Sequence, residues 1–209
     1  MDKLSLPQVE LIVKTMADTA IKNEAYFSEL DGVMGDADFG VSLAGGFKAV
    51  LKNWDGFDHS NIGGLLLNVA TTITGNTGGC SGPVWGTLFM RTGMALKGKT
   101  EITVEEIISG LQSAIEGISK RGGAVLGDKT LLDALDAIVK TLEANKSAPM
   151  LEAFKQAGDA AVQMRETSKG WTAKRGRQSF TGDRSIGTYD PGIVAVGDMA
   201  VAIVEALGA

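Results

Sequence analysis

Three aspartates stand close together near the start of the chain, in the stretch LDGVMGDADFG. Asp31, Asp36 and Asp38 fall within eight residues, and the glycines among them allow a tight curl because glycine tolerates positive φ. Magnesium prefers carboxylate and phosphate oxygens in a near-octahedral arrangement. The spacing therefore admits two interpretations, a solvated acidic turn and a carboxylate site for one or two Mg²⁺ ions that hold a phosphate compound.

A second unusual stretch, GNTGGCSGPVWG at residues 75–86, leads into the expected start of a helix near Pro83. Free backbone N–H groups and the positive end of a helix favour anions at such a place. We expect Ser81 to cap this helix, to bind a phosphate oxygen, or to do both, and Cys80 to permit close approach. A plain turn between helices is the alternative, but the glycines exceed what capping requires, which favours phosphate.

The stretch GGAVLGDKT at residues 122–130 approaches the pattern of a P-loop, but Asp128 separates the glycine from the lysine. Since the preceding sequence also does not resemble a strand, we reject the P-loop interpretation. We expect Asp128 to cap the following helix. Lys129 is expected to be solvated or to reach toward the rim of the fold.

A basic run, KRGRQSFTGDR, follows at residues 174–184. Most of its cations are expected to be solvated. A single arginine directed at a phosphate would help to offset the negative charge of three carboxylates and a diphosphate. Asp190 precedes Pro191 and Gly192, so we expect it to cap the last helix or to bind a ligand at that helix end.

The composition is that of a globular protein. Its 209 residues suit one domain over residues 1–209, and a hydrophobic content of 44 % is enough for a core. The net charge of −5 argues against nucleic-acid binding, which needs a basic face. The N-terminal stretch does not resemble a signal peptide, and no stretch approaches the ~18 consecutive apolar residues of a membrane span. We therefore expect a soluble, cytoplasmic protein with no membrane partner.

Apolar residues recur at helical spacing along almost the whole chain, and strand-like alternation is nearly absent. Two helices are expected to open with capping boxes, formed by Ser5 with Gln8 and by Thr103 with Glu106. The connection at residues 169–190 is unusually long, which is typical of a functional or disordered segment. The pattern predicts eight helices at about 5–30, 40–53, 61–75, 83–97, 103–118, 128–144, 149–168 and 191–207.

If these helices run up and down, as short connections favour, their connections alternate between the two ends. The connections after the second, fourth and sixth helices are ordinary polar turns, and the first of these holds His59, the single histidine. The connections after the first, third, fifth and seventh helices hold the glycine clusters, the acids and the basic run. We therefore predict an all-α, up-and-down eight-helix bundle or barrel with its functional site at one rim.

Four of these stretches together resemble a known family. LDGVMGDADFG, GGCSGPVWG, GDKTLLDAL and GRQSFTGDRSIGTYDPG occur in order along nearly the whole chain and are similar to the nucleotide-binding L subunit of dihydroxyacetone kinase. The resemblance implies an eight-helix barrel that binds ADP or ATP at one rim through two Mg²⁺ ions. It also implies that Asp31, Asp36 and Asp38 are the metal ligands.

The resemblance further implies which residues contact the nucleotide, and it names no catalytic side chain on this chain. Two helix starts would hold the phosphates, a slot would hold the adenine, and the start of the last helix would close over the nucleotide. The implied residues are Phe39, Gly40, Val41, Ser42, Cys80 and Ser81 around the phosphates, Gly122 and Leu131 at the adenine, Arg177 on a phosphate, and Asp190, Pro191 and Gly192 over the nucleotide.

The reaction that the resemblance implies is phosphoryl transfer to an alcohol. In this family a separate K subunit binds a short ketose covalently through its own histidine, and the L subunit supplies the phosphoryl group. The donor is either free ATP or a phosphotransferase-system protein that recharges bound ADP. We expect a homodimer or a complex with the K subunit.

Two departures from the family pattern leave the donor and the ketose open. The family usually has histidine or cysteine where Phe39 stands, and often histidine where Thr188 stands. The loss of these polar contacts leaves the retention of ADP open and makes erythrulose a credible substrate. Two other functions remain as alternatives, a nucleotide-binding regulatory module without transfer activity and a helical interaction protein without a ligand.

Overall fold

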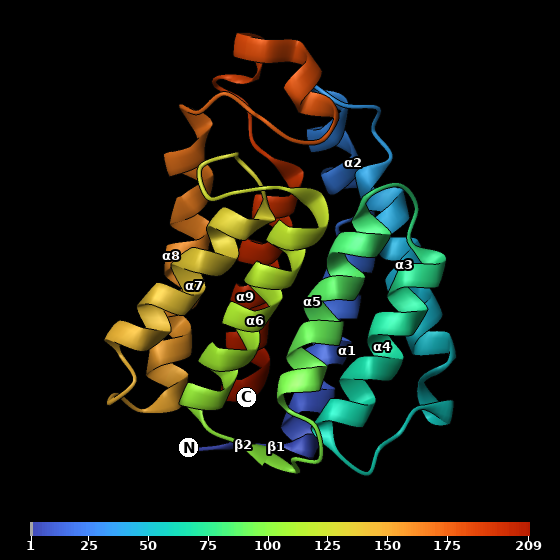
Figure 1. Cartoon of the computed structure of the whole chain (residues 1–209), viewed down its shortest axis with the longest axis vertical. Helices are drawn as coiled ribbons and strands as arrows, with labels where there is room; N and C mark the ends of the chain where they lie inside the picture. The colour runs from blue at the N-terminus through green and yellow to red at the C-terminus, as the bar shows by residue number, and fades with distance from the viewer. Residues whose placement is uncertain (1) are drawn as a thin grey trace.

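The computed structural model describes residues 2–209, which Figure 1 shows as an elongated bundle of helices. Short elements are the 3₁₀ helices η1 (Trp54–Gly56) and η2 (Arg177–Ser185) and the strands β1 (Leu4–Ser5) and β2 (Glu101–Ile102). The predicted all-α class is confirmed. The α-helices found within this part of the chain are α1 (Leu6–Lys22), α2 (Glu24–Gly32), α3 (Phe39–Lys52), α4 (Ile62–Asn76), α5 (Ser81–Ala95), α6 (Val104–Gly122), α7 (Leu131–Ala144), α8 (Met150–Lys169) and α9 (Pro191–Gly208).

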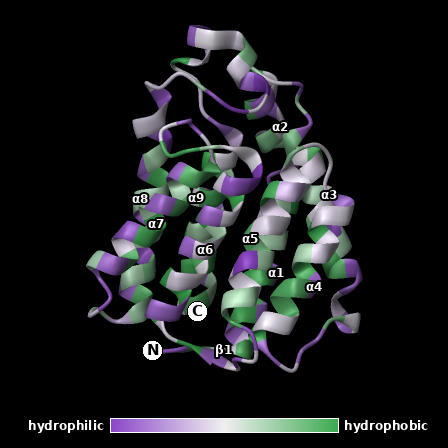
Figure 2. Cartoon of the chain, in the orientation of Figure 1, coloured by the Kyte–Doolittle hydropathy of each residue, from purple (hydrophilic) through white to green (hydrophobic). Residues whose placement is uncertain are grey.

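Helices that follow one another in the chain lie side by side, and the ring closes because α9 packs against both α8 and α1. Large apolar side chains such as Phe47, Leu65 and Trp85 are buried inside the ring, where their removal from water stabilises the fold. An apolar cavity of about 220 Å³ remains in the interior, with walls that come from α1, α4 to α9 and both strands. Figure 2 shows that the connections at the two ends carry much of the hydrophilic colour.

The expected first helix over residues 5–30 is wrong in one respect, because the structure divides it into α1 and α2 at Asn23. Asn23 has φ of −98° and ψ of 13°, and its side-chain Nδ2 donates to the carbonyl of Thr19 at 3.0 Å. Asparagine competes in this way with the hydrogen bonds of the helix backbone, which ends α1. The separate helix α2 packs against α3 and carries Asp31 in its last turn.

Both predicted capping boxes are present. The backbone N–H of Ser5 donates to Gln8 Oε1 at 2.9 Å, and the N–H of Thr103 donates to Glu106 Oε2 at the same distance. The two strands pair antiparallel, with Leu4 opposite Ile102, and so join the start of α1 to the start of α6. Local signals therefore set these helix starts, as expected from the sequence.

Helix α9 is apolar enough in length and composition to cross a membrane, with a mean hydropathy of 1.6 over residues 191–208. Its first half, including Ile193–Val196, is buried, and it packs against α1, α7 and α8. Its Asp198 pairs with Arg165 of α8. These contacts describe a core helix of the barrel.

The unusual connections gather at one end of the barrel, as the alternation of helices predicts (Figure 1). The opposite end holds the β1–β2 ribbon and both termini. His59 also lies at that opposite end, in the connection between α3 and α4, where its Nδ1 is 2.7 Å from Glu10 Oε1. The end that holds the candidate site, upper in Figure 1, contains the connections 33–38, 77–80, 123–130 and 170–190.

Candidate functional site

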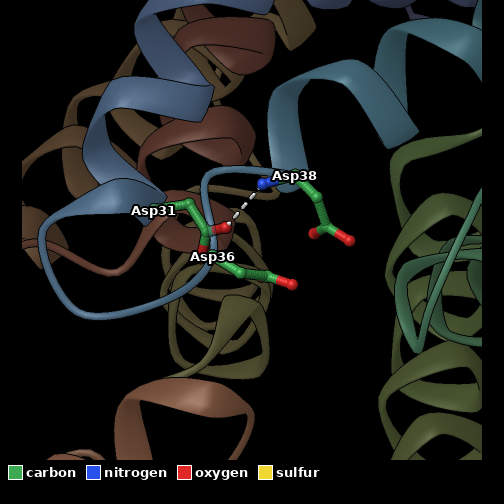
Figure 3. Close-up of side chains that lie close together, drawn as sticks. All are labelled: Asp31, Asp36 and Asp38. Carbon is green, nitrogen blue, oxygen red and sulfur yellow. Dashed lines mark hydrogen bonds between the residues drawn. The ribbon is translucent and has the colours of Figure 1, made fainter.

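The three aspartates form an acidic cluster between α2 and α3, as Figure 3 shows. One carboxylate oxygen from each of Asp31, Asp36 and Asp38 lies within 4.8 Å of the other two. Asp31 is buried, whereas Asp36 and Asp38 are exposed. The backbone N–H of Asp38 donates to Asp31 Oδ2 at 3.1 Å, which ties the end of α2 to the start of α3. The structure therefore brings together the three residues that the sequence proposed as metal ligands.

Three small residues make this tight arrangement possible. A Cβ on Gly35 would lie 2.3 Å from Asp31 Oδ1, so only glycine fits there. Ala37 has φ of 61°, a left-handed conformation that is uncommon outside glycine and that turns the chain between Asp36 and Asp38. A Cβ on Gly40 would lie 2.0 Å from the carbonyl oxygen of Glu24, so α3 crosses α2 in close backbone contact.

The electrostatics of the acidic cluster favour a bound cation. Burial raises the pKa of Asp38, and the negative charges of Asp36 and Asp31 raise it further, while Arg177 opposes them. Arg177 Nε lies 2.8 Å from Asp36 Oδ2, so one cation already faces the cluster. Oxygen ligands with mutual repulsion are a donor set that suits a hard divalent ion.

Two helix starts meet beside the acidic cluster. Helix α3 begins at Phe39, directly after Asp38, and the first N–H groups of a helix have no partner within it. A Cβ on Gly78, in the turn before α5, would lie 2.8 Å from Ser42 Oγ, so this turn touches the first turn of α3. The expectation that Ser81 caps α5 is wrong, since Cys80 holds the N-cap position and Ser81 is the first helical residue.

The starts of α7 and α9 also meet at this end of the barrel. A Cβ on Gly192 would lie 3.3 Å from the Cβ of Leu131, which is closer than ordinary van der Waals contact. Asp190 caps α9 as expected, because its Oδ1 accepts the N–H of Ile193 at 2.9 Å. Removal of this carboxyl from water raises the pKa of Asp190 to about 7. Gly122, the last residue of α6, has open space beside it.

The connection between α6 and α7 differs from expectation. Asp128 does not cap α7; Thr130 does, in a capping box with Asp133. Asp128 instead accepts from Arg175 Nε at 2.9 Å and from the N–H of Val125 at 3.0 Å. The capping assignment failed because Asp128 is engaged by Arg175, 47 residues away, and because the capping box of Thr130 with Asp133 was overlooked.

Lys129 is buried, with 1 % of its surface exposed, so the expectation of a solvated side chain is wrong. Burial lowers the pKa of its ammonium group, although the charge of Asp190 opposes this. The alternative expectation, that Lys129 reaches toward the rim, agrees with the structure, because its Nζ donates to carbonyl oxygens of Trp171 and Ser185 in the connection over that rim.

Residues 170–190 form a cap over this end of the barrel, and part of the cap is the 3₁₀ helix η2. Of the basic run, Lys174 and Arg184 are exposed as expected, whereas Arg175 and Arg177 pair with acids of the barrel. Arg177 reaches the acidic cluster, where it pairs with Asp36, and its contact with a phosphate stays a prediction.

The family model described as the DAK2 domain matches residues 33–207. This chain belongs to the DAK2 domain family. A relative within the family is the protein named "PEP-dependent dihydroxyacetone kinase, ADP-binding subunit DhaL" of Escherichia coli, which is 34 % identical over 198 residues that cover 92 % of this chain and 93 % of the relative. The "PTS-dependent dihydroxyacetone kinase, ADP-binding subunit DhaL" of Lactococcus lactis is 33 % identical over 82 % of each chain.

A solved structure shares the DAK2 fold. The dihydroxyacetone kinase of C. freundii, in complex with AMP-PNP and Mg²⁺, superimposes with a TM-score of 0.73 at 24 % identity. The match covers 98 % of this chain and 34 % of that longer chain. At this identity the likeness supports the helical fold, while the site itself is argued from the residues above.

Proposed function

We propose that this chain is the nucleotide-binding, phosphoryl-transfer subunit of a dihydroxyacetone-type kinase. The observation that carries the proposal is the convergence of Asp31, Asp36 and Asp38 to within 4.8 Å at the rim of a DAK2 barrel. Relatives that match almost the full chain are named ADP-binding subunits, so a diphosphate is the anion that the ions would hold.

The acidic cluster would hold two Mg²⁺ ions. Its three carboxylates supply hard oxygen ligands, and their mutual repulsion falls when a cation binds. Bound magnesium would neutralise the charge of the phosphates and orient them. Two ions, a diphosphate of about −3 and three carboxylates together leave roughly −2, which the adjacent Arg177 would partly offset.

The helix starts beside the cluster would bind the phosphates. The backbone N–H of Phe39 donates to Asp31 Oδ2 at 3.4 Å, and those of Gly40 and Val41 follow it in the first turn of α3. The turn before α5 lies against Ser42. Cys80 and Ser81 present the first N–H groups of α5 to the same region. No side chain of this chain needs to act as a base, because phosphoryl transfer depends mainly on positioning and charge neutralisation.

The adenine would lie between the end of α6 and the start of α7. Gly122 leaves space there, and Leu131 offers an apolar surface. Leu131 also contacts Gly192, so Asp190, Pro191 and Gly192 at the start of α9 would close over the nucleotide.

The acceptor would come from a separate subunit that carries a short ketose. The relatives are named subunits of dihydroxyacetone kinases that depend on PEP or on the phosphotransferase system, so a protein of that system would recharge bound ADP. The protein would act in the cytoplasm, together with the ketose-carrying subunit and the phosphotransferase-system protein.

Calorimetric titration of Mg-ADP into the full chain tests the proposal. Asp36→Asn should weaken binding by at least about tenfold, because it removes one ligand charge while keeping the side-chain shape. The matched control is Asp159→Asn, the same change at an exposed site on α8, which should bind as the wild type does. Binding that is equal in all three proteins would contradict the proposal.

Transfer is then tested with a K-type subunit, Mg-ATP, and either dihydroxyacetone or erythrulose as the acceptor. Phosphorylated ketose should form with the wild-type chain and not with Asp36→Asn. The same assay is run with a phosphotransferase-system protein and PEP in place of ATP, because that system is the donor named for the relatives. If the wild type binds Mg-ADP but supports no transfer with either ketose and either donor, the chain is a regulatory module instead.

A further inference from the structure

The cap over the site has almost no apolar anchor. Within residues 170–190, all of which the structure describes, Ala173 is the only buried apolar side chain, and Phe180 is 87 % exposed. Tyr189, near the end of the cap, packs partly buried against the core, so apolar burial anchors the cap near its ends and contributes little over residues 174–186. The cap must be held mainly by polar contacts with the barrel.

Lys129 supplies two of these polar contacts from a buried position. Its Nζ donates to the carbonyl oxygen of Trp171 at 3.1 Å and to that of Ser185 at 2.7 Å. Trp171 lies at the start of the cap and Ser185 ends η2, so one ammonium group joins two segments of the cap that are 14 residues apart in the sequence. The same two segments are also joined directly, because the N–H of Ala173 donates to Ser185 Oγ at 2.9 Å.

The backbone conformation of Lys129 indicates that the surrounding structure holds its side chain in this buried position. Lys129 has φ of 62°, and among the described residues it shares a positive φ outside glycine only with Ala37 of the acidic cluster. A side chain with a Cβ is strained in this conformation, and such strain concentrates at functional positions. Glycine would relieve the strain but would lack the ammonium group.

We propose that Lys129 is a positioning residue that latches the cap onto the barrel and thereby holds Arg177 against the acidic cluster. Residues 172–184 form a loop closed by the two bonds of Lys129, and Arg177 lies within this loop. The Arg177 side chain is 66 % exposed and has its ion-pair partner, Asp36, on a different connection. Its place at the cluster therefore depends on how the loop is held.

Other contacts of the cap do not replace the latch. Arg175, whose side chain is 44 % exposed, pairs with Asp128, which is 4 % exposed, and the N–H of Lys174 donates to the carbonyl oxygen of Asp128 at 3.0 Å. These contacts hold the cap only at residues 174 and 175, whereas Lys129 holds it at Trp171 and at Ser185. A buried charged donor with two carbonyl acceptors is a stronger anchor.

Hydrogen exchange of the nucleotide-free full chain, followed by mass spectrometry, tests the latch. In Lys129→Met, amides of residues 172–186 should exchange at least about tenfold faster than in the wild type, while those of α4 and α5 stay unchanged. Lys129→Gly should show the same effect, since it removes the ammonium without adding backbone strain. The matched control is Lys174→Met, which changes an exposed lysine on the cap and should leave all rates unchanged.

A second measurement connects the latch to the site and rests on the proposed function. Release of a fluorescent ADP in the presence of Mg²⁺ should be about tenfold faster from Lys129→Met, because Arg177 is no longer held in place. Binding of Mn²⁺ alone should not weaken, since the three carboxylates lie on another connection and the loss of the Arg177 charge beside Asp36 favours a cation there.

The outcomes separate the two proposals. If the wild type binds no nucleotide, the proposed function fails, and the exchange data still decide the latch. Unchanged exchange of the cap in both Lys129 variants would overturn the latch. Faster exchange of α4 and α5 as well, or global unfolding of Lys129→Gly, would also overturn it, because Lys129 would then stabilise the whole barrel.

Discussion

Gly40→Ala is expected to separate α3 from α2, the two helices whose close packing positions the acidic cluster. The new Cβ would lie 2.0 Å from the carbonyl oxygen of Glu24 and 2.7 Å from the backbone nitrogen of Ser28, where ordinary contact begins at 3.4 Å. Since both atoms belong to the backbone of α2, relief requires the helices to separate by about 1.4 Å, the difference between 3.4 and 2.0 Å. Strain from such overpacking costs about 1–3 kcal/mol.

The same movement would carry Asp38 away from Asp31. Their hydrogen bond of 3.1 Å would lengthen beyond bonding distance, and Mg²⁺ tolerates little error because its ligands lie at about 2.0–2.1 Å. We expect affinity for Mg-ADP to fall by at least about tenfold. Urea denaturation measures the stability, and calorimetry measures the binding.

Gly45→Ala on the same helix is the matched control. Its Cβ would meet only the carbonyl oxygen of Asn76, at 3.6 Å, which is an ordinary contact. Alanine favours a helix over glycine, so stability should rise by up to about 1 kcal/mol and binding should not change. A Gly40→Ala protein that matches the wild type in stability and affinity would refute the close packing of α3 on α2.

Two further predictions concern the start and the middle of α9. Asp190 has a pKa of about 7 in the folded protein against 3.8 for the free group, so the folded state holds its proton more tightly and stability falls as the pH rises from 4 to 7. This fall amounts to at most about 4 kcal/mol, and Asp190→Asn, which keeps a capping side chain, should remove it in urea titrations at pH 5 and pH 8. Arg165→Met should cost about 1–3 kcal/mol because it leaves Asp198 without its ion-pair partner, and adding Asp198→Asn should recover part of that loss in the same assay.

The helical class and most helix starts could be predicted because their signals are local. The capping box of Thr103 with Glu106 lies within four residues, and the apolar period of 3.6 residues marks each buried face. The gathering of the unusual connections at one end could also be predicted, since short connections force neighbouring helices to run antiparallel.

Features that depend on distant residues could not be predicted in this way. Lys129 is buried because its ammonium group meets carbonyls of Trp171 and Ser185, which lie 42 and 56 residues further along the chain. Nothing within the stretch GDKT distinguishes this lysine from a solvated one. The break at Asn23 has a local cause, but the apolar period continues across it and hid the division between α1 and α2.

The most direct test of the account is a crystal structure of the chain grown with ADP and Mn²⁺, in which anomalous scattering locates the ions. The account predicts ions bound by oxygens of Asp31, Asp36 and Asp38, with the diphosphate of ADP on the same ions at the starts of α3 and α5. Ions or nucleotide bound elsewhere, with the three carboxylates directed into water, would contradict it.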